Sequence, residues 1–146
     1  MTRGFFIDLF FKMMNKIEHI GIAVNNLEEA IKTYTELLGT ACYKTEAVES
    51  EGVKTAFFKV GDSKIELLEA SGENSPIAKF IAKKGEGIHH IAFDVSDIGS
   101  SMKDLAGKGF QLLNEVPKNG ADNKLVAFLH PKSSNGVLVE LCQEKP

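Results

Sequence analysis

The sequence predicts an α+β fold in which two βαβββ modules pack together and form a metal-binding cleft. The first observation is a repeat: His19 begins a strand-like apolar run, and His90 begins a similar run 71 residues later, counting from 19 to 90. Each run leads into a segment with helical spacing. Each half then contains an apolar strand with one acidic residue, Glu66 or Glu140. Because one module alone would expose a sheet face and an edge, two are expected to pack against each other.

Composition limits the possible functions. The 146 residues suffice for one compact domain or for two small modules that share a core. A hydrophobic fraction of 43% with 25% charged residues is ordinary for a globular protein. A net charge of −3 and the absence of a run of lysines or arginines argue against a nucleic-acid partner. Cys42 and Cys142 are too few for a disulfide framework and lack metal-ligand spacing, which favours a reduced, cytoplasmic setting.

Residues 1–14 are expected to form an N-terminal extension outside the single domain at 15–146. Asp8 and Lys12 interrupt the aromatic-rich start, and no small-residue cleavage pattern follows, so a secretory signal is not expected. The apolar run is also far shorter than the roughly 20 residues that a membrane-spanning helix needs. We therefore expect no membrane partner. Residues 1–13 are expected either to pack on the surface or to precede an alternative start at Met14.

Module one is expected to cover residues 15–70. Asn26 precedes a run with helical spacing and can cap it, and Gly39 is suited to end that helix. The short Gly61-Asp62-Ser63 segment reads as a hairpin turn. The expected elements are a strand over 17–24, a helix over 27–38 and two strands over 53–60 and 64–69.

A connecting helix over 75–84 is expected to precede module two at 87–143. Ser75 can cap this helix, Pro76 suits its first position and Gly85 can close it. In module two, Asp97 can cap a helix that ends at Gly109. The further expected elements are a strand over 88–95, a short strand over 111–114, a polar loop to 123 and strands over 125–129 and 137–142.

Strand parity places both repeated histidines on a cavity wall. Side chains alternate across a strand, so residues two apart share a face. His19 then shares its face with Gly21, and His90 shares its face with Ala92. The bulky aliphatic and aromatic residues of both strands lie on the other face, where the helices are expected to pack.

Two histidines and two acids, matched between the halves, predict one metal site. An acid in an apolar strand is costly to bury unless it is paired or bound to a metal. A lone strand histidine is more often an ordinary core residue than a ligand, and His89 and His130, which lack such an acid, are assigned no role. Imidazole and carboxylate ligands suit a divalent Mn, Co, Ni, Zn or Fe ion that acts as a Lewis acid. The predicted ligands are His19, Glu66, His90 and Glu140.

The repeat, the two H-I-x-x-x-V strands and the strings I-E-L-L and V-L-V-E-L resemble the vicinal-oxygen-chelate (glyoxalase/bleomycin-resistance/dioxygenase) superfamily. In that superfamily, two βαβββ modules form the glyoxalase-like fold and enclose a metal site with one ligand from each of four strands. The strings at 75–80, 87–92 and 128–132 are similar to the methylmalonyl-CoA epimerase family within it. The resemblance covers about residues 15–143.

The resemblance implies an isomerase that interconverts the epimers of methylmalonyl-CoA through an enolate-like intermediate, as a homodimer. Such a reaction needs two acid/base groups. Glu140 is one candidate. The family's other proposed base is a glutamate on the second strand, where this chain has Thr55, and Glu49 and Glu51 lie close by without aligning. The polar-loop residues Lys118 and Lys132 could contact the CoA phosphates or could equally be solvated.

Three other functions fit the pattern less well. Glyoxalase I (lactoylglutathione lyase) shares the fold and the ligands, but it usually has a first-strand arginine that the run at 19–24 lacks. An asparagine that follows its Ile-Glu-Leu strand is also replaced here by the residues at 69–71. Extradiol dioxygenases bind iron with two histidines and one glutamate, which would leave Glu66 superfluous. A metal-free small-molecule-binding protein would not need the complete set of ligands.

Overall fold

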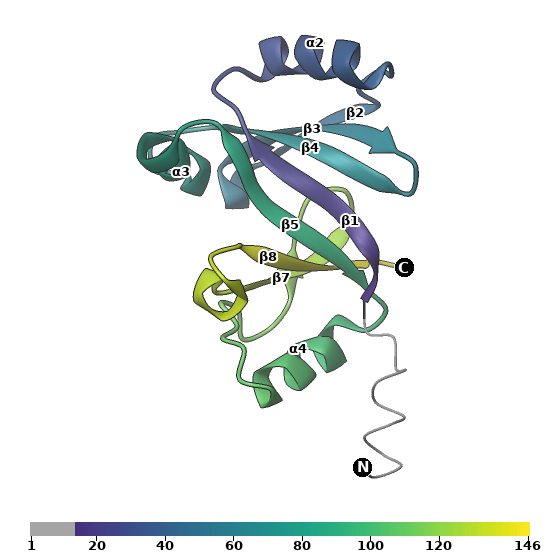
Figure 1. Ribbon diagram of the computed structural model, residues 1–146, viewed down its shortest axis with the longest axis vertical. Helices are drawn as coiled ribbons and strands as arrows, with labels where there is room; N and C mark the ends of the chain where they lie inside the picture. The colour runs from purple at the N-terminus through teal and green to yellow at the C-terminus, as the bar shows by residue number, and fades with distance from the viewer. Residues whose placement is uncertain (1–13) are drawn as a thin grey trace.

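The computed structural model describes residues 14–146 and contains one mixed sheet of eight strands in the order β2-β3-β4-β1-β5-β8-β7-β6 (Figure 1). Two of the three helices in this part of the chain cover the outer side of the sheet. The strands are β1 Met14–Ala23, β2 Lys44–Val48, β3 Val53–Val60, β4 Ser63–Ala70, β5 Gly87–Val95, β6 Lys118–Asn119, β7 Lys124–Leu129 and β8 Val139–Glu144. The helices are α2 Leu27–Leu38, α3 Pro76–Lys84 and α4 Ile98–Gly107, with 3-10 turns η1 Glu49–Glu51 and η2 Pro131–Ser134.

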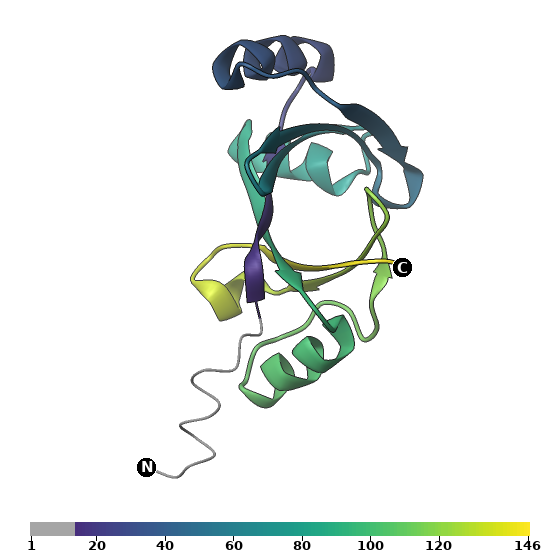
Figure 2. The same ribbon diagram turned by 90° about the vertical axis from the view of Figure 1, so that its right-hand side faces the viewer.

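The sheet confirms the predicted pair of βαβββ modules. In each module the first strand is parallel to the last: β1 pairs with β4, and β5 pairs with β8. The two modules join through the antiparallel pair β1–β5. The sheet curls into a half-barrel, which Figure 2 shows end-on. The two strands that contain the repeated histidines, β1 and β5, therefore lie side by side at the centre of the sheet.

The outer face of the sheet holds two apolar clusters, one under each module's helix. α2 packs over module one and α4 over module two, as the parity of β1 and β5 predicts (Figure 1). α3 instead packs against the inner side near Ala23 and Leu68, where Ile77 is buried. The cluster under α2 contains Val24, Leu27, Ala56, Phe58 and Leu67, and the cluster under α4 contains Val95, Ile98, Met102, Leu105, Ala127, Leu129, Val139 and Leu141.

The predicted helix caps are confirmed. The Asn26 side chain accepts a hydrogen bond from the Glu29 backbone N–H, and Gly39 ends α2 in the left-handed conformation with φ 67°. The Ser75 side chain caps α3, and the Asp97 side chain caps α4. Each of the side chains of Asn26, Ser75 and Asp97 satisfies a backbone donor that the first turn of a helix leaves without a partner.

The strand predicted over 111–114 is wrong. In the described chain only Leu112 forms a bridge there, to Leu129. Side chains replace part of the missing ladder, because Oδ1 of the Asn114 side chain accepts from the Phe128 N–H and the Ser133 hydroxyl accepts from the Gln111 N–H.

Several boundaries also differ from the predictions. The short strand β6 lies in the segment expected to be a loop, and β2 occupies a segment to which the sequence assigned no strand. α4 ends at Gly107 rather than Gly109, and β8 begins at Val139 rather than at residue 137. β1 begins at Met14, the last residue assigned to the extension. The rest of that expected extension, 1–13, lies outside the described residues.

Within residues 14–146 no helix is both long and apolar enough to cross a membrane.

Candidate metal centre

Three of the four predicted ligands converge on one buried point. The Nε2 atoms of His19 and His90 lie 2.9 Å apart. Glu140 Oε1 lies 3.2 Å from Nε2 of His90, and Glu140 Oε2 lies 3.7 Å from Nε2 of His19. All three side chains are buried. Their ligand atoms lie within 4.8 Å of one another, close enough to hold one ion.

Glu66, the fourth predicted ligand, approaches His19 from the other side of the ring. Its Oε2 lies 3.1 Å from Nδ1 of His19, so it does not join the group at the two Nε2 atoms. The side chain is nevertheless buried and lines the same cavity. Glu66 is therefore in place beside the centre, with its carboxylate turned to Nδ1.

A glycine makes room for His90. In the β1–β5 pair Gly21 lies opposite His90. A Cβ atom at Gly21 would lie 2.2 Å from Cε1 and 2.6 Å from Nδ1 of that ring, far inside any real contact. The imidazole of His90 thus lies directly against the backbone of β1.

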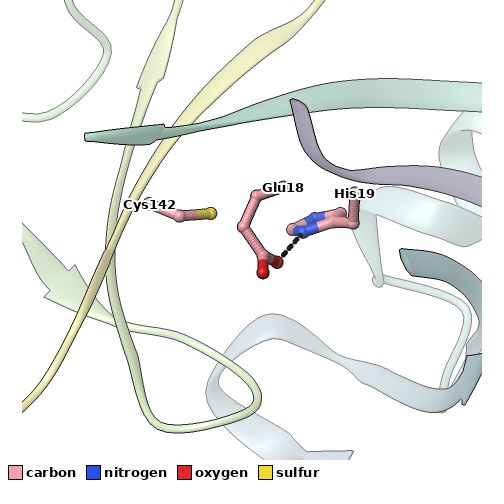
Figure 3. Close-up of side chains that lie close together, drawn as sticks. All are labelled: Glu18, His19 and Cys142. Atoms are coloured by element: carbon pink, nitrogen blue, oxygen red, sulfur yellow. Dashed lines mark hydrogen bonds and ion pairs between the residues drawn. The ribbon is translucent and has the colours of Figure 1, made fainter. Parts of the chain in front are cut away.

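The sequence analysis missed Glu18, which is only 3% exposed. The β1–β5 ladder pairs Ile17 with Phe93 and His19 with Ala92, so Glu18 is an extra residue in a β-bulge. A bulge re-aims side chains that simple alternation would separate. Glu18 Oε1 lies 2.8 Å from Nδ1 of His19 (Figure 3). The signal for it was an acid in an apolar strand, the same signal that selected Glu66.

His89, which was assigned no role, also contacts the centre. The ladder pairs Gly21 with His90 and Ile22 with Ile88, so His89 is skipped as well. Its Nδ1 lies 3.0 Å from Nδ1 of His90. The other residue assigned no role, His130, caps η2 by accepting from the Lys132 N–H and lies outside the cavity lining.

Two lysines hold Glu18. The ammonium of Lys64 lies 3.1 Å from Glu18 Oε2, and that of Lys124 lies 4.0 Å from it. Lys64 also pairs with Asp122 at 2.7 Å. Burial alone would raise the pKa of Glu18, but the hydrogen bond to His19 and the charge of Lys64 lower it to about 2. Glu18 is thus a buried carboxylate that stays ionised.

The other carboxylates and imidazoles perturb one another strongly. Burial raises the pKa of Glu66 to about 7 and raises the pKa of Glu140. Burial lowers the pKa of His19, but Glu66, Glu18 and Glu140 outweigh it and raise the pKa to about 9. Burial and the neighbouring His19 and His89 lower the pKa of His90. Three carboxylates around two imidazoles fit a divalent first-row cation, which would balance their negative charge and accept mixed N/O ligation.

The centre forms part of the wall of a cavity of about 360 Å³. Ligand pockets are commonly of this size. Glu51, Thr55 and Lys118 also line the cavity. The Thr55 hydroxyl is buried and has no hydrogen-bond partner in the described structure. The Lys118 ammonium lies 2.9 Å from Glu51 and above the ring of Phe128.

Lys132, by contrast, is exposed on η2 and does not line the cavity.

Comparisons with known proteins agree with this geometry. The family model of the glyoxalase/bleomycin resistance protein/dioxygenase superfamily matches residues 18–128. The ethylmalonyl-CoA/methylmalonyl-CoA epimerase of Cereibacter sphaeroides is 42% identical, over 90% of this chain and 99% of that protein. The mitochondrial methylmalonyl-CoA epimerase of Homo sapiens is 41% identical, over 89% of this chain and 74% of that protein. The crystal structure of methylmalonyl-CoA epimerase from Mycobacterium tuberculosis has a TM-score of 0.89 and 34% identity, covering 92% of this chain and 91% of that chain.

The similarity to glyoxalase I is weaker. A probable lactoylglutathione lyase of Vibrio parahaemolyticus is 27% identical, over 89% of this chain and 91% of that protein.

Proposed function

Because the chain belongs to the methylmalonyl-CoA epimerase family of the glyoxalase/bleomycin resistance protein/dioxygenase superfamily, we propose that it interconverts the two epimers of methylmalonyl-CoA. The observation that carries this proposal is the convergence of His19, His90 and Glu140 at the wall of a cavity that also exposes a second carboxylate. The reaction removes a proton from the carbon between the thioester and the carboxylate and returns one to its opposite face. It therefore needs charge stabilisation at the thioester oxygen and two proton carriers.

His19, His90 and Glu140 would hold a divalent ion, with Glu66 as a fourth ligand once its carboxylate turns from Nδ1 of His19. When bound, a Co, Mn, Ni, Zn or Fe ion would act as a Lewis acid on the thioester carbonyl and stabilise its developing negative charge.

Glu140 is the first proton carrier. It lies at the centre and lines the cavity, so it can reach the α-carbon of a substrate bound there. The Cys142 thiol donates a hydrogen bond to Glu140 Oε2 at 2.8 Å and holds that oxygen in position.

Glu51 is the second proton carrier. It enters the cavity from the η1 turn of module one, whereas Glu140 enters from β8 of module two. A substrate bound between them would present opposite faces of its α-carbon to the two carboxylates. Lys118 pairs with Glu51 at 2.9 Å and holds its carboxylate at the cavity wall. The free hydroxyl of Thr55 is placed to donate a hydrogen bond to the acyl group.

An acyl-CoA would enter with its thioester at the centre and its nucleotide outside the cavity. Lys118 lies on the cavity wall beside Glu51, where it can contact an oxygen of the acyl group or of the adjoining pantetheine arm rather than a CoA phosphate. Lys132, on the exposed η2 turn, could only contact a part of CoA that lies beyond the cavity. A homodimer and a cytoplasmic location remain expectations, and light scattering on the purified protein checks the first of them.

The proposal is tested with metal-loaded protein, one epimer of methylmalonyl-CoA and deuterated water. Deuterium should appear at the α-carbon while the other epimer accumulates. The same preparation is assayed with the hemithioacetal of methylglyoxal and glutathione. If there is no exchange and the hemithioacetal is converted, the protein is a glyoxalase I and the proposal fails.

A further inference from the structure

Each repeated histidine is preceded by a residue that a β-bulge leaves out of the β1–β5 ladder and that contacts Nδ1 of that histidine. In module one the residue is Glu18, and in module two it is His89. We propose that Glu18 and His89 are a matched pair of positioning residues that fix the Nδ1 side of His19 and His90, so that both Nε2 atoms face the ion. The proposal rests on the metal centre of the proposed function and adds the groups that orient it.

The contact of Glu18 determines which nitrogen of His19 is free. An ionised carboxylate only accepts hydrogen bonds, so Nδ1 of His19, 2.8 Å from Glu18 Oε1, must donate. A ring that binds an ion must be neutral, and with the proton on Nδ1 its lone pair is then on Nε2. That atom is the one that faces His90 and Glu140.

Glu18 is better held than the other carboxylate at Nδ1. It contacts the ammonium groups of Lys64 and Lys124 as well as His19. Among the described residues, Glu66 has an ion pair with His19 alone. Glu66 can therefore turn toward the ion while Glu18 keeps the hydrogen bond to Nδ1.

His89 fixes His90 in the same way with a weaker group. The two Nδ1 atoms lie 3.0 Å apart, so one ring donates to the other. When His90 donates, its Nε2 has the lone pair and faces Glu140 Oε1 at 3.2 Å. The ring of Phe80 packs edge-on against His89 at a centroid distance of 4.9 Å and limits its rotation.

The chemistry of the two partners predicts unequal effects. An imidazole that donates a hydrogen bond to a carboxylate is polarised more strongly than one that donates to a neutral imidazole. Loss of such a partner commonly weakens metal binding by about 10–100-fold. We expect Glu18→Gln to lie near the upper part of that range and His89→Phe near the lower part, because phenylalanine keeps the packing but removes the acceptor nitrogen.

The test measures binding of Co²⁺ alone, by competition with a chelator, together with the visible ligand-field spectrum of the Co²⁺ protein. Both variants should bind Co²⁺ more weakly and show an altered spectrum, while their metal-free melting temperatures report whether they are folded. Glu49→Gln makes the same change as Glu18→Gln on an exposed acid outside the cavity, and His130→Phe is the matched control for His89. Both controls should match the wild type in Co²⁺ affinity and in the Co²⁺ spectrum.

Wild-type affinity and an unchanged spectrum in folded Glu18→Gln and His89→Phe would overturn the proposal. If Glu18→Gln does not fold, His89→Phe decides the outcome alone. No substrate is present, so the result is separate from the proposed reaction. If the wild type binds Co²⁺ but has no epimerase activity, the proposed epimerase function is refuted. The positioning proposal is then still decided by the Co²⁺ affinities and spectra of the variants.

Discussion

Replacing Gly21 with alanine should displace His90 and damage the centre. The new Cβ would lie 2.2 Å from Cε1 of His90, whereas non-bonded carbon atoms pack at about 3.5–4.0 Å. The ring or β1 must therefore move by roughly 1 Å or more. Gly21 is not among the residues with positive φ, so the backbone itself accepts alanine and the contact alone sets the cost. Overpacking of this kind costs about 1–3 kcal/mol, and a misplacement of about 1 Å can lower a rate by about 100-fold.

Three measurements check this prediction: the metal-free melting temperature, Co²⁺ affinity and the rate of epimerisation. The melting temperature should fall by roughly 2–4 °C for each kcal/mol, with weaker Co²⁺ binding and a loss of about 100-fold in rate. The control is Gly107→Ala at the end of α4, where a Cβ meets nothing within 4 Å. A Gly21→Ala protein with wild-type Co²⁺ affinity and wild-type rate would refute the reasoning.

Three further predictions concern the cavity and the charge network. Glu51→Gln should slow epimerisation by about 10²–10⁴-fold while Glu140 still exchanges the proton on its own side, and equal loss of exchange and epimerisation would contradict the assignment. Thr55→Val removes a buried hydroxyl without a partner, so the free energy of unfolding, measured by thermal unfolding, should rise by about 1–3 kcal/mol. The KM for methylmalonyl-CoA should also rise, and an unchanged KM would contradict a contact between Thr55 and the substrate. The third prediction concerns Asp122. Burial alone would raise the pKa of this carboxyl group, but hydrogen bonds from Lys44 and Lys64 lower it to about 2. Its ionised form therefore stabilises the fold above the unfolded value of about 3.9, and this contribution disappears as the pH falls through 2. Urea unfolding of the wild type and of Asp122→Asn should accordingly differ at pH 5 and converge near pH 2, and a constant difference would contradict the ion pairs.

The sequence predicted the elements whose signals are local and periodic. The caps at Asn26, Ser75 and Asp97 are set by one side chain and the next few residues, so the helix starts could be read directly. The strands of the repeat were found because apolar runs and turn residues bound them. The strand expected over 111–114 failed because side chains such as Asn114 satisfy backbone groups that a ladder would otherwise pair.

The site was predicted in part for the same reason. Parity placed His19 and His90 on the faces away from the bulky residues, and the matched repeat added Glu140; the structure brings the three together. The rule assumes an unbroken ladder, however, and a bulge is a property of how two strands pair rather than of either strand alone. Glu18 and His89, the residues that the ladder omits, could therefore not be assigned to the centre from their own strands.

The register of the central strands explains why a duplication yields one centre rather than two. In the antiparallel β1–β5 pair, His19 lies opposite Ala92 and His90 lies opposite Gly21. Each histidine thus faces the small residue that comes two positions after the other histidine, and that residue leaves space for the ring. The parallel neighbours β4 and β8 bring the acids to the same two small residues, because Glu66 pairs with Gly21 and Glu140 pairs with Ala92. Each small residue lies between the histidine of one module and the acid of the other, so the side chains at positions 21 and 92 set the room available to all four predicted ligands.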